Sequence, residues 1–295
     1  MNNKRRLFST LLCVAALTAG LFVSGCGSDK AGGIGSVVSS VVDGGSDEKA
    51  AAKLNTLIDA TNNFNGDNAT WGQNYADSLA KLKGGFQEGA IGRQPHYDTL
   101  KDALEKSKKE GSTFKEVDTE RDNVLNVLNE LVPTFKDLKA YDDSKAYMND
   151  GGAKGKELAA KYVAQVEKFD AAYAKFNDAL NKANTEQTKK QIEKLKKDGK
   201  KGYAAAMEST LRLTTLVENV EKSPKNADKQ AVEKELNEIQ TLLKSINNDR
   251  GEVLVNSYNS VVGSVRQVLN DANENNLNDM IENFNNYIES YNNTT

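Results

Sequence analysis

A long hydrophobic stripe with helical spacing constrains the fold of this chain more than any other feature of its sequence. Within residues 153–201, apolar side chains recur at steps of four and three that alternate almost perfectly. This spacing places them on one face of a helix, as in a helical bundle or a coiled coil. The stripe consists of Leu158, Tyr162, Val166, Phe169, Tyr173, Phe176 and Leu180.

Similar stripes cover most of the remaining chain, and no long stretch alternates with the period of two that is typical of a strand. They occupy residues 54–82, 117–138, 203–217, 232–246, 254–269 and 277–291, and a shorter helix is expected at 96–110. The chain contains only 3 prolines, which also favours long helices. The sequence therefore predicts an all-α fold, an elongated multi-helix bundle of long antiparallel helices.

Some boundaries and the domain organisation are also predicted. We expect the first helix to continue through Gly66, and the helix that contains Pro133 to be kinked there and to end near Tyr147. Residues 149–152 are the expected turn before the longest helix. A single domain over residues 47–295 is the simplest organisation, and two stacked bundles that divide near residues 189–202 are the alternative.

The amino terminus has the organisation of a bacterial export signal. Basic residues at positions 4–6 precede an apolar segment at 7–23, and small residues follow. The segment is too short and too interrupted for a transmembrane helix, which needs about 20 apolar residues. We therefore predict that residues 1–25 are a cleaved signal peptide. Residues 26–46 are the predicted lipidated cysteine and a flexible Gly/Ser-rich tether with a reach of roughly 25 Å.

The end of this signal, Val23-Ser24-Gly25-Cys26, resembles the bacterial lipoprotein signal. The resemblance implies cleavage before Cys26, a diacylglyceryl thioether on its sulfur, and an acyl chain such as palmitate on the new amino terminus. Several acyl chains together anchor a protein stably to a membrane. We expect a protein of the bacterial cell envelope, on the non-cytoplasmic face of either the outer or the cytoplasmic membrane. An ordinary secretion signal with a chance cysteine is the alternative.

The remaining composition excludes several classes of function. Cys13 lies within the signal, so the mature chain keeps no thiol besides Cys26 for a disulfide, a zinc site or a nucleophile. The chain has a net charge of −3, whereas nucleic-acid-binding proteins usually carry a cluster of positive charge, so we expect no nucleic-acid partner. Lysine runs at 189–190 and 194–201 are interleaved with acids, and we interpret them as solvated helix faces.

Residue types that perform catalysis are scarce in this chain. His96 is the only histidine, and a histidine-pair metal motif or a bundle cofactor site needs more than one. We therefore expect no catalytic residue, no metal site and no cofactor. The acids near residues 141–150 flank a turn with two tyrosines. Helix-terminal polarity and turn chemistry are the simplest interpretation of these acids, and a small polar or cationic contact site is the functional alternative.

The same turn carries a resemblance to a known family. Residues 131–141 and 145–158 are similar to the YiiG-like bacterial lipoproteins, a family of unknown function also called DUF3829. In that family a helix with a tyrosine leads into a turn with Lys-Gly-Lys and a second long helix. Ala159 stands where a histidine is expected. The resemblance implies an all-helical fold and brings no established activity. The candidate binding residues are Tyr141, Asp142, Asp143, Tyr147, Asp150, Lys154 and Lys156.

Three hypotheses for the function follow from the sequence. The first is a non-enzymatic, lipid-anchored helical protein that binds an envelope partner. The second is a lipoprotein that binds a small ligand in a pocket between helices near residues 141–156, which requires a concave space with converging polar groups. The third is an enzyme that uses carboxylates alone, which requires two acids in a cleft and a raised pKa for one of them.

Overall fold

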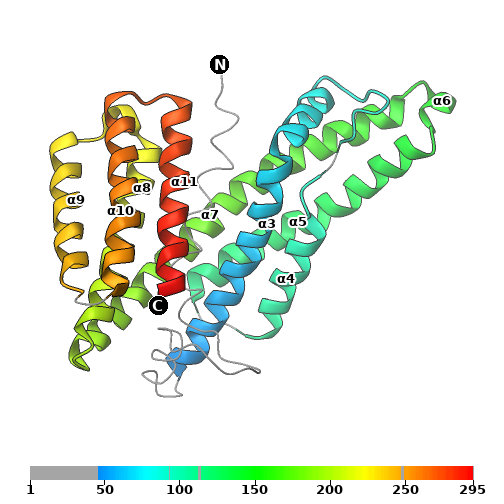
Figure 1. Cartoon of the computed structure of the whole chain (residues 1–295). Helices are drawn as coiled ribbons and strands as arrows, with labels where there is room; N and C mark the ends of the chain where they lie inside the picture. The colour runs from blue at the N-terminus through cyan, green and yellow to red at the C-terminus, as the bar shows by residue number, and fades with distance from the viewer. Residues whose placement is uncertain (1–45, 93, 112–113, 247–248, 295) are drawn as a thin grey trace. The chain divides into compact units, whose positions relative to one another are not determined.

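The chain folds into helices connected by short turns and loops (Figure 1). The computed structural model describes residues 46–92, 94–111, 114–246 and 249–294, and every regular element in these ranges is helical. The predicted all-α fold class is therefore confirmed. The predicted signal peptide, Cys26 and the tether up to residue 45 lie outside the described residues. In chain order the helices are α3 (Ser46–Lys83), α4 (Tyr97–Lys109), α5 (Lys115–Asp143), α6 (Tyr147–Asp150), α7 (Ala153–Lys197), α8 (Lys201–Lys222), the 3-10 helix η2 (Pro224–Asn226), α9 (Lys229–Lys244), α10 (Asp249–Asn270) and α11 (Glu274–Thr294).

The helices form two compact units. Of the described residues, 56–183 belong to the first unit, and 184–294 together with 46–55 belong to the second. The division falls inside α7, between Ala183 and Asn184. The two-bundle alternative from the sequence places it further along the chain, near residues 189–202.

In the first unit, α3, α4 and α7 contribute to an aromatic core. Phe64 of α3, Tyr97 of α4, and Phe169 and Tyr173 of α7 contact one another, with ring centroids 5.0–5.8 Å apart. The rings of Phe64 and Tyr97 each meet Phe169 edge to face, whereas Phe169 and Tyr173 are stacked. Such aromatic pairs add a specific geometry to the burial of apolar surface. Phe169 is only 3% exposed, so the stripe predicted on α7 faces the core.

Two of the predicted helix boundaries can be compared directly with the structure. α3 is a single helix that passes through Gly66, as predicted. α5 continues through Pro133 and ends at Asp143, before the end that the sequence predicts near Tyr147. A separate short helix, α6, occupies the residues in between and joins α5 to α7 (Figure 1).

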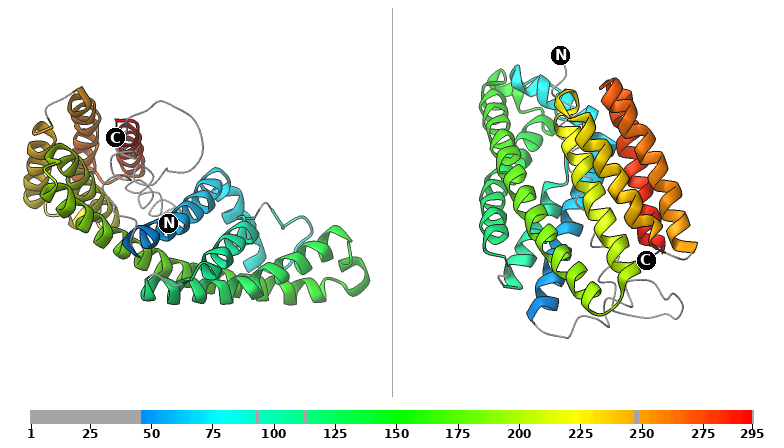
Figure 2. Two further views of the ribbon diagram at one scale, coloured as in Figure 1. Left: turned by 90° about the horizontal axis from the view of Figure 1, so that it is seen from below. Right: turned by 90° about the vertical axis from the view of Figure 1, so that its left-hand side faces the viewer.

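In the second unit, the helices α8, α9, α10 and α11 lie side by side and bury the stripes that the sequence predicts for them (Figures 1 and 2). Their shared core includes Val217 of α8, Ile239 of α9, Tyr258 of α10 and Phe284 of α11, all of which are at most 1% exposed. Short connections between these helices suit an antiparallel bundle.

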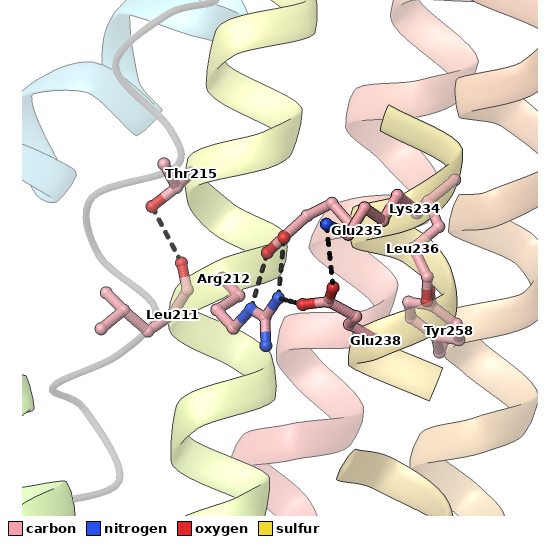
Figure 3. Close-up of polar contacts among 8 residues, drawn as sticks. All are labelled: Leu211, Arg212, Thr215, Lys234, Glu235, Leu236, Glu238 and Tyr258. Carbon is pink, nitrogen blue, oxygen red and sulfur yellow. Dashed lines mark hydrogen bonds and ion pairs between the residues drawn. The ribbon is translucent and has the colours of Figure 1, made fainter. Parts of the chain in front are cut away.

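Polar contacts at the edge of this core join α8 to α9 (Figure 3). The Arg212 guanidinium donates two hydrogen bonds to the Glu235 carboxylate, at 2.6 and 2.7 Å, and also pairs with Glu238. Such two-point pairing fixes the orientation of the two side chains as well as the distance between them. The Tyr258 hydroxyl donates to the Leu236 carbonyl and ties α10 to the same helix. Together these contacts fix the position of α9 between its neighbours.

Candidate functional site

The structure brings the candidate binding residues into one tight turn of the first unit. Tyr141, Asp142 and Asp143 end α5, Tyr147 and Asp150 lie on α6, and Lys154 and Lys156 belong to the first turn of α7. We call residues 141–156 the α5–α7 corner.

The backbone of the corner follows from how α5 ends. The Ala146 N–H donates to the Tyr141 carbonyl at 3.1 Å, and the Lys145 N–H donates to the Asp142 carbonyl at 2.9 Å. This pair of bonds is a Schellman motif, which needs a left-handed residue after the helix. Lys145 takes that conformation with φ 53°. Since glycine usually occupies this position, the sequence contains no obvious signal for the end of α5.

Asp150 is the centre of the hydrogen bonding in the corner. Its carboxylate accepts from the Tyr141 hydroxyl at 2.5 Å, the Gly152 N–H at 2.9 Å and the Lys154 N–H at 3.1 Å. These bonds, that of Tyr141 above all, hold the pKa of Asp150 below its usual value. The carboxylate also satisfies N–H groups at the start of α7, where a negative charge is favourable.

Aromatic rings fill the space beneath this network. Phe86, from the loop after α3, lies against Tyr141 with ring centroids 5.2 Å apart and against Tyr147 at 5.8 Å. A Cβ atom at Gly155 would lie 2.6 Å from carbons of both Phe86 and Tyr141. Glycine therefore allows α7 to approach the two rings directly. The interior of the corner is packed, which argues against an enclosed ligand pocket between these helices.

Phe86 belongs to the functional region but was not among the residues predicted from the sequence. It lies 55 positions before Tyr141 in a glycine-containing loop, and no local pattern connects the two segments. The contact arises because the Ser78 hydroxyl holds this loop against α3, donating to the Ala90 carbonyl at 2.6 Å and accepting from the Gly92 N–H at 2.9 Å.

The other candidate side chains lie at the surface of the corner. Asp142 accepts a long hydrogen bond from the Gly89 N–H at 3.4 Å, and Asp143 pairs with Lys139 at 2.8 Å. Lys154 and Lys156 are exposed, and neither forms an ion pair with the part of the chain that the structure describes.

An exposed methionine accompanies these charges. Met148 of α6 is 72% exposed, which is unusual for a large apolar side chain in a folded protein. Beside it, the carboxylate of Glu88 raises the pKa of Tyr147 to about 12. The surface thus combines an apolar tip with charges of both signs. Met148 was not predicted, because a single methionine in a polar turn has no periodic pattern.

The chemistry of the corner differs from that of an acid–base catalytic site. A general acid needs a raised pKa, whereas that of Asp150 is lowered. Within the described ranges, no group of three or more His, Cys, Asp or Glu side chains is arranged to hold a metal ion. His96, the single histidine, lies exposed at the N-cap of α4.

A second polar cluster lies inside the first unit, away from the surface. The Tyr75 and Tyr97 hydroxyls are 2.9 Å apart, and the Tyr162 hydroxyl donates to Gln94. Near them, burial raises the pKa of Asp170 to about 6. Because the three tyrosines and Gln94 are all buried, this cluster contributes to the core and offers no open face to a substrate.

The protein is thus an all-helical protein of two units, whose candidate site is the packed, hydrogen-bonded α5–α7 corner. None of the described helices is both long and apolar enough to span a bilayer. The chain belongs to DUF3829, a family described as a protein of unknown function, whose model matches residues 48–283. The family resemblance stated from residues 131–158 is therefore confirmed. No curated protein and no solved structure matches the chain.

Proposed function

We propose that this protein is a lipid-anchored, non-catalytic component of the bacterial cell envelope that binds a partner protein through the α5–α7 corner. The observation that carries the proposal is the combination at this corner of a packed interior and an exposed tip. The buried Tyr141 and its hydrogen bond to Asp150 hold the turn in one shape, while Met148 remains 72% exposed.

A rigid tip with one prominent apolar side chain suits contact with another protein. Methionine is common on protein-binding surfaces because its unbranched, polarizable side chain adapts to different partners. The nearby charges of Asp143, Lys154 and Lys156 would supply the polar rim and the specificity of such a contact. A small-ligand pocket is the weaker alternative, since the rings of Phe86 and Tyr141 occupy the space it needs.

The membrane anchor is proposed from the lipoprotein-like signal that ends at Cys26. We expect Cys26→Ala to move the protein from the membrane fraction to the soluble fraction of cells, because the thioether that carries the lipid can no longer form. Immunoblotting of the two fractions measures this distribution. Unchanged membrane association of the variant would refute the anchor.

Site-specific photo-crosslinking in cells tests the partner surface. A photoreactive amino acid replaces Met148 in the lipidated protein, and a matched sample carries it at Asn129, an exposed position on α5. Asn129 lies fourteen residues before the end of α5, about 21 Å along the helix. A third sample combines the probe at position 148 with Cys26→Ala.

The expected result is a crosslink from position 148 to one envelope protein, weaker with Cys26→Ala and missing from position 129. Mass spectrometry of the product identifies the partner. Self-crosslinks alone, or identical products from positions 148 and 129, would overturn the corner as the binding surface. A ligand screen on the same protein would then test the pocket alternative.

A further inference from the structure

The end of α7 and the start of α8 carry a dense cluster of positive charge. Residues 189–201 contain seven lysines and two acids, whereas the whole chain has a net charge of −3. Of these lysines, Lys196 alone forms ion pairs with described residues, to Glu193 at 3.4 Å and Glu208 at 2.9 Å. The other six, which we call the α7–α8 lysine surface, are Lys189, Lys190, Lys194, Lys197, Lys200 and Lys201.

The geometry of the two helices gathers these side chains. Residues three or four positions apart on a helix share a face. A surface depression of about 450 Å³ is lined by four of the lysines, Lys189, Lys190, Lys194 and Lys197, together with Glu193 and Asp198. α7 then ends in a tight turn, in which Gly199 has φ 74° and the Lys200 N–H donates to the Leu195 carbonyl at 2.9 Å. This turn places the first lysines of α8 directly after the last lysines of α7.

The position of Lys200 and Lys201 is unfavourable for α8 itself. They lie at the amino terminus of the helix, which has no side-chain cap and no acidic residue in its first turn. A positive charge at this end opposes the helix dipole, and the first N–H groups of a helix need acceptors from elsewhere. A bound anion with oxygen acceptors would relieve both problems.

We infer that the α7–α8 lysine surface binds the phosphate headgroups of the anionic membrane beside which the protein is anchored. This inference rests on the proposed lipid anchor at Cys26, since the anchor brings the surface to the bilayer. Clusters of four to eight basic residues next to a membrane are typical of binding to anionic lipids.

Vesicle binding of the unlipidated protein tests the surface separately from the anchor. The mature chain, which begins at position 26 and carries Cys26→Ala, is mixed with vesicles of phosphatidylcholine alone or of phosphatidylcholine with phosphatidylglycerol, and bound protein is measured by co-sedimentation. We expect binding only to the anionic vesicles. It should weaken strongly between about 0.05 and about 0.5 M salt, because the contact is electrostatic.

The test variant in the same background carries K189Q, K194Q and K197Q. Each lysine contributes about fivefold to binding an anionic surface, so we expect a loss of about 100-fold. The matched control carries K161Q, K168Q and K175Q. It makes the same charge change at exposed positions of the same helix that have no ion pair with described residues, and we expect it to bind nearly as well as the parent.

Circular dichroism confirms that both variants remain folded, since glutamine is about as helix-favouring as lysine. Equal losses in the two variants would assign binding to net charge alone and overturn the inference. Equal binding to neutral and anionic vesicles, or no binding to either, would also overturn it. None of these outcomes concerns Cys26-dependent fractionation or crosslinking at position 148, so the anchor and the partner surface stand or fall separately.

Discussion

Replacing Gly155 with alanine tests the packing of the α5–α7 corner. The new methyl carbon would lie 2.6 Å from the Phe86 and Tyr141 rings, whereas an ordinary contact between carbon atoms is about 3.5–4.0 Å. The rings or α7 must therefore move by about 1 Å. Overpacking of this kind costs about 1–3 kcal/mol, and the better helix propensity of alanine offsets at most about 1 kcal/mol. We expect net destabilisation of about 1–2 kcal/mol.

Gly202 supplies the matched control. Like Gly155, it lies in the first turn of a helix, but no atom lies within 4 Å of the Cβ that alanine would add. Gly202→Ala should therefore stabilise the protein by about 0.5–1 kcal/mol through helix propensity alone.

Urea denaturation measures both variants, with far-UV circular dichroism as the general probe. The reasoning is refuted if Gly155→Ala is as stable as the wild-type protein, or if it gains stability as Gly202→Ala does. Either result would mean that Phe86 does not pack against α7 as described.

Three further predictions concern single side chains of the first unit. Phe169→Ala should cost about 3–5 kcal/mol in chemical denaturation, since it empties the aromatic core; a loss below about 1 kcal/mol would contradict this burial. Burial raises the pKa of Asp170 to about 6, so folding penalises its ionised form and stability falls as pH rises from about 4 to about 6. Asp170→Asn should therefore stabilise the protein by about 1–3 kcal/mol near neutral pH and have little effect near pH 4, and thermal melts at both pH values check the difference. The lowered pKa of Asp150 changes stability with pH in the opposite direction. Its contribution to stability is present above the pKa of the unfolded state and is lost as pH falls through the pKa of the folded state. Tyr141→Phe removes the main donor, so melting temperatures measured against pH should fall less steeply in acid than those of the wild-type protein; an unchanged slope would exclude this hydrogen bond.

Helix content and helix faces were predictable from the sequence because they depend on local spacing. Phe169 and Tyr173 repeat at the period of a helix, and both face the core. The end of α5 was not predictable to the residue, because Lys145 adopts a backbone conformation that usually indicates glycine. The sequence offered the division into two units only as an alternative and placed it near residues 189–202, since the hydrophobic stripe on α7 continues without a break towards the observed division after Ala183.

The candidate site was predictable in its polar part only. Asp150 stood out because it follows two tyrosines and directly precedes a Gly-Gly turn. Its hydrogen bonds are the turn chemistry that such a residue favours. The packing partner Phe86 comes from a distant loop, and such a contact depends on the tertiary fold, which periodicity does not contain. The proposed protein-binding role of Met148 likewise depends on its exposure.

The passage of α7 through both units has a practical consequence for dividing the protein. Separate domains are usually joined by exposed linkers, where a chain tolerates cleavage, insertion or truncation. Here the division between Ala183 and Asn184 lies within an unbroken helix of 45 residues. Cutting the chain there would leave uncapped carbonyl groups at the end of the first fragment and uncapped N–H groups at the start of the second. The two units are therefore best expressed and studied as a single chain.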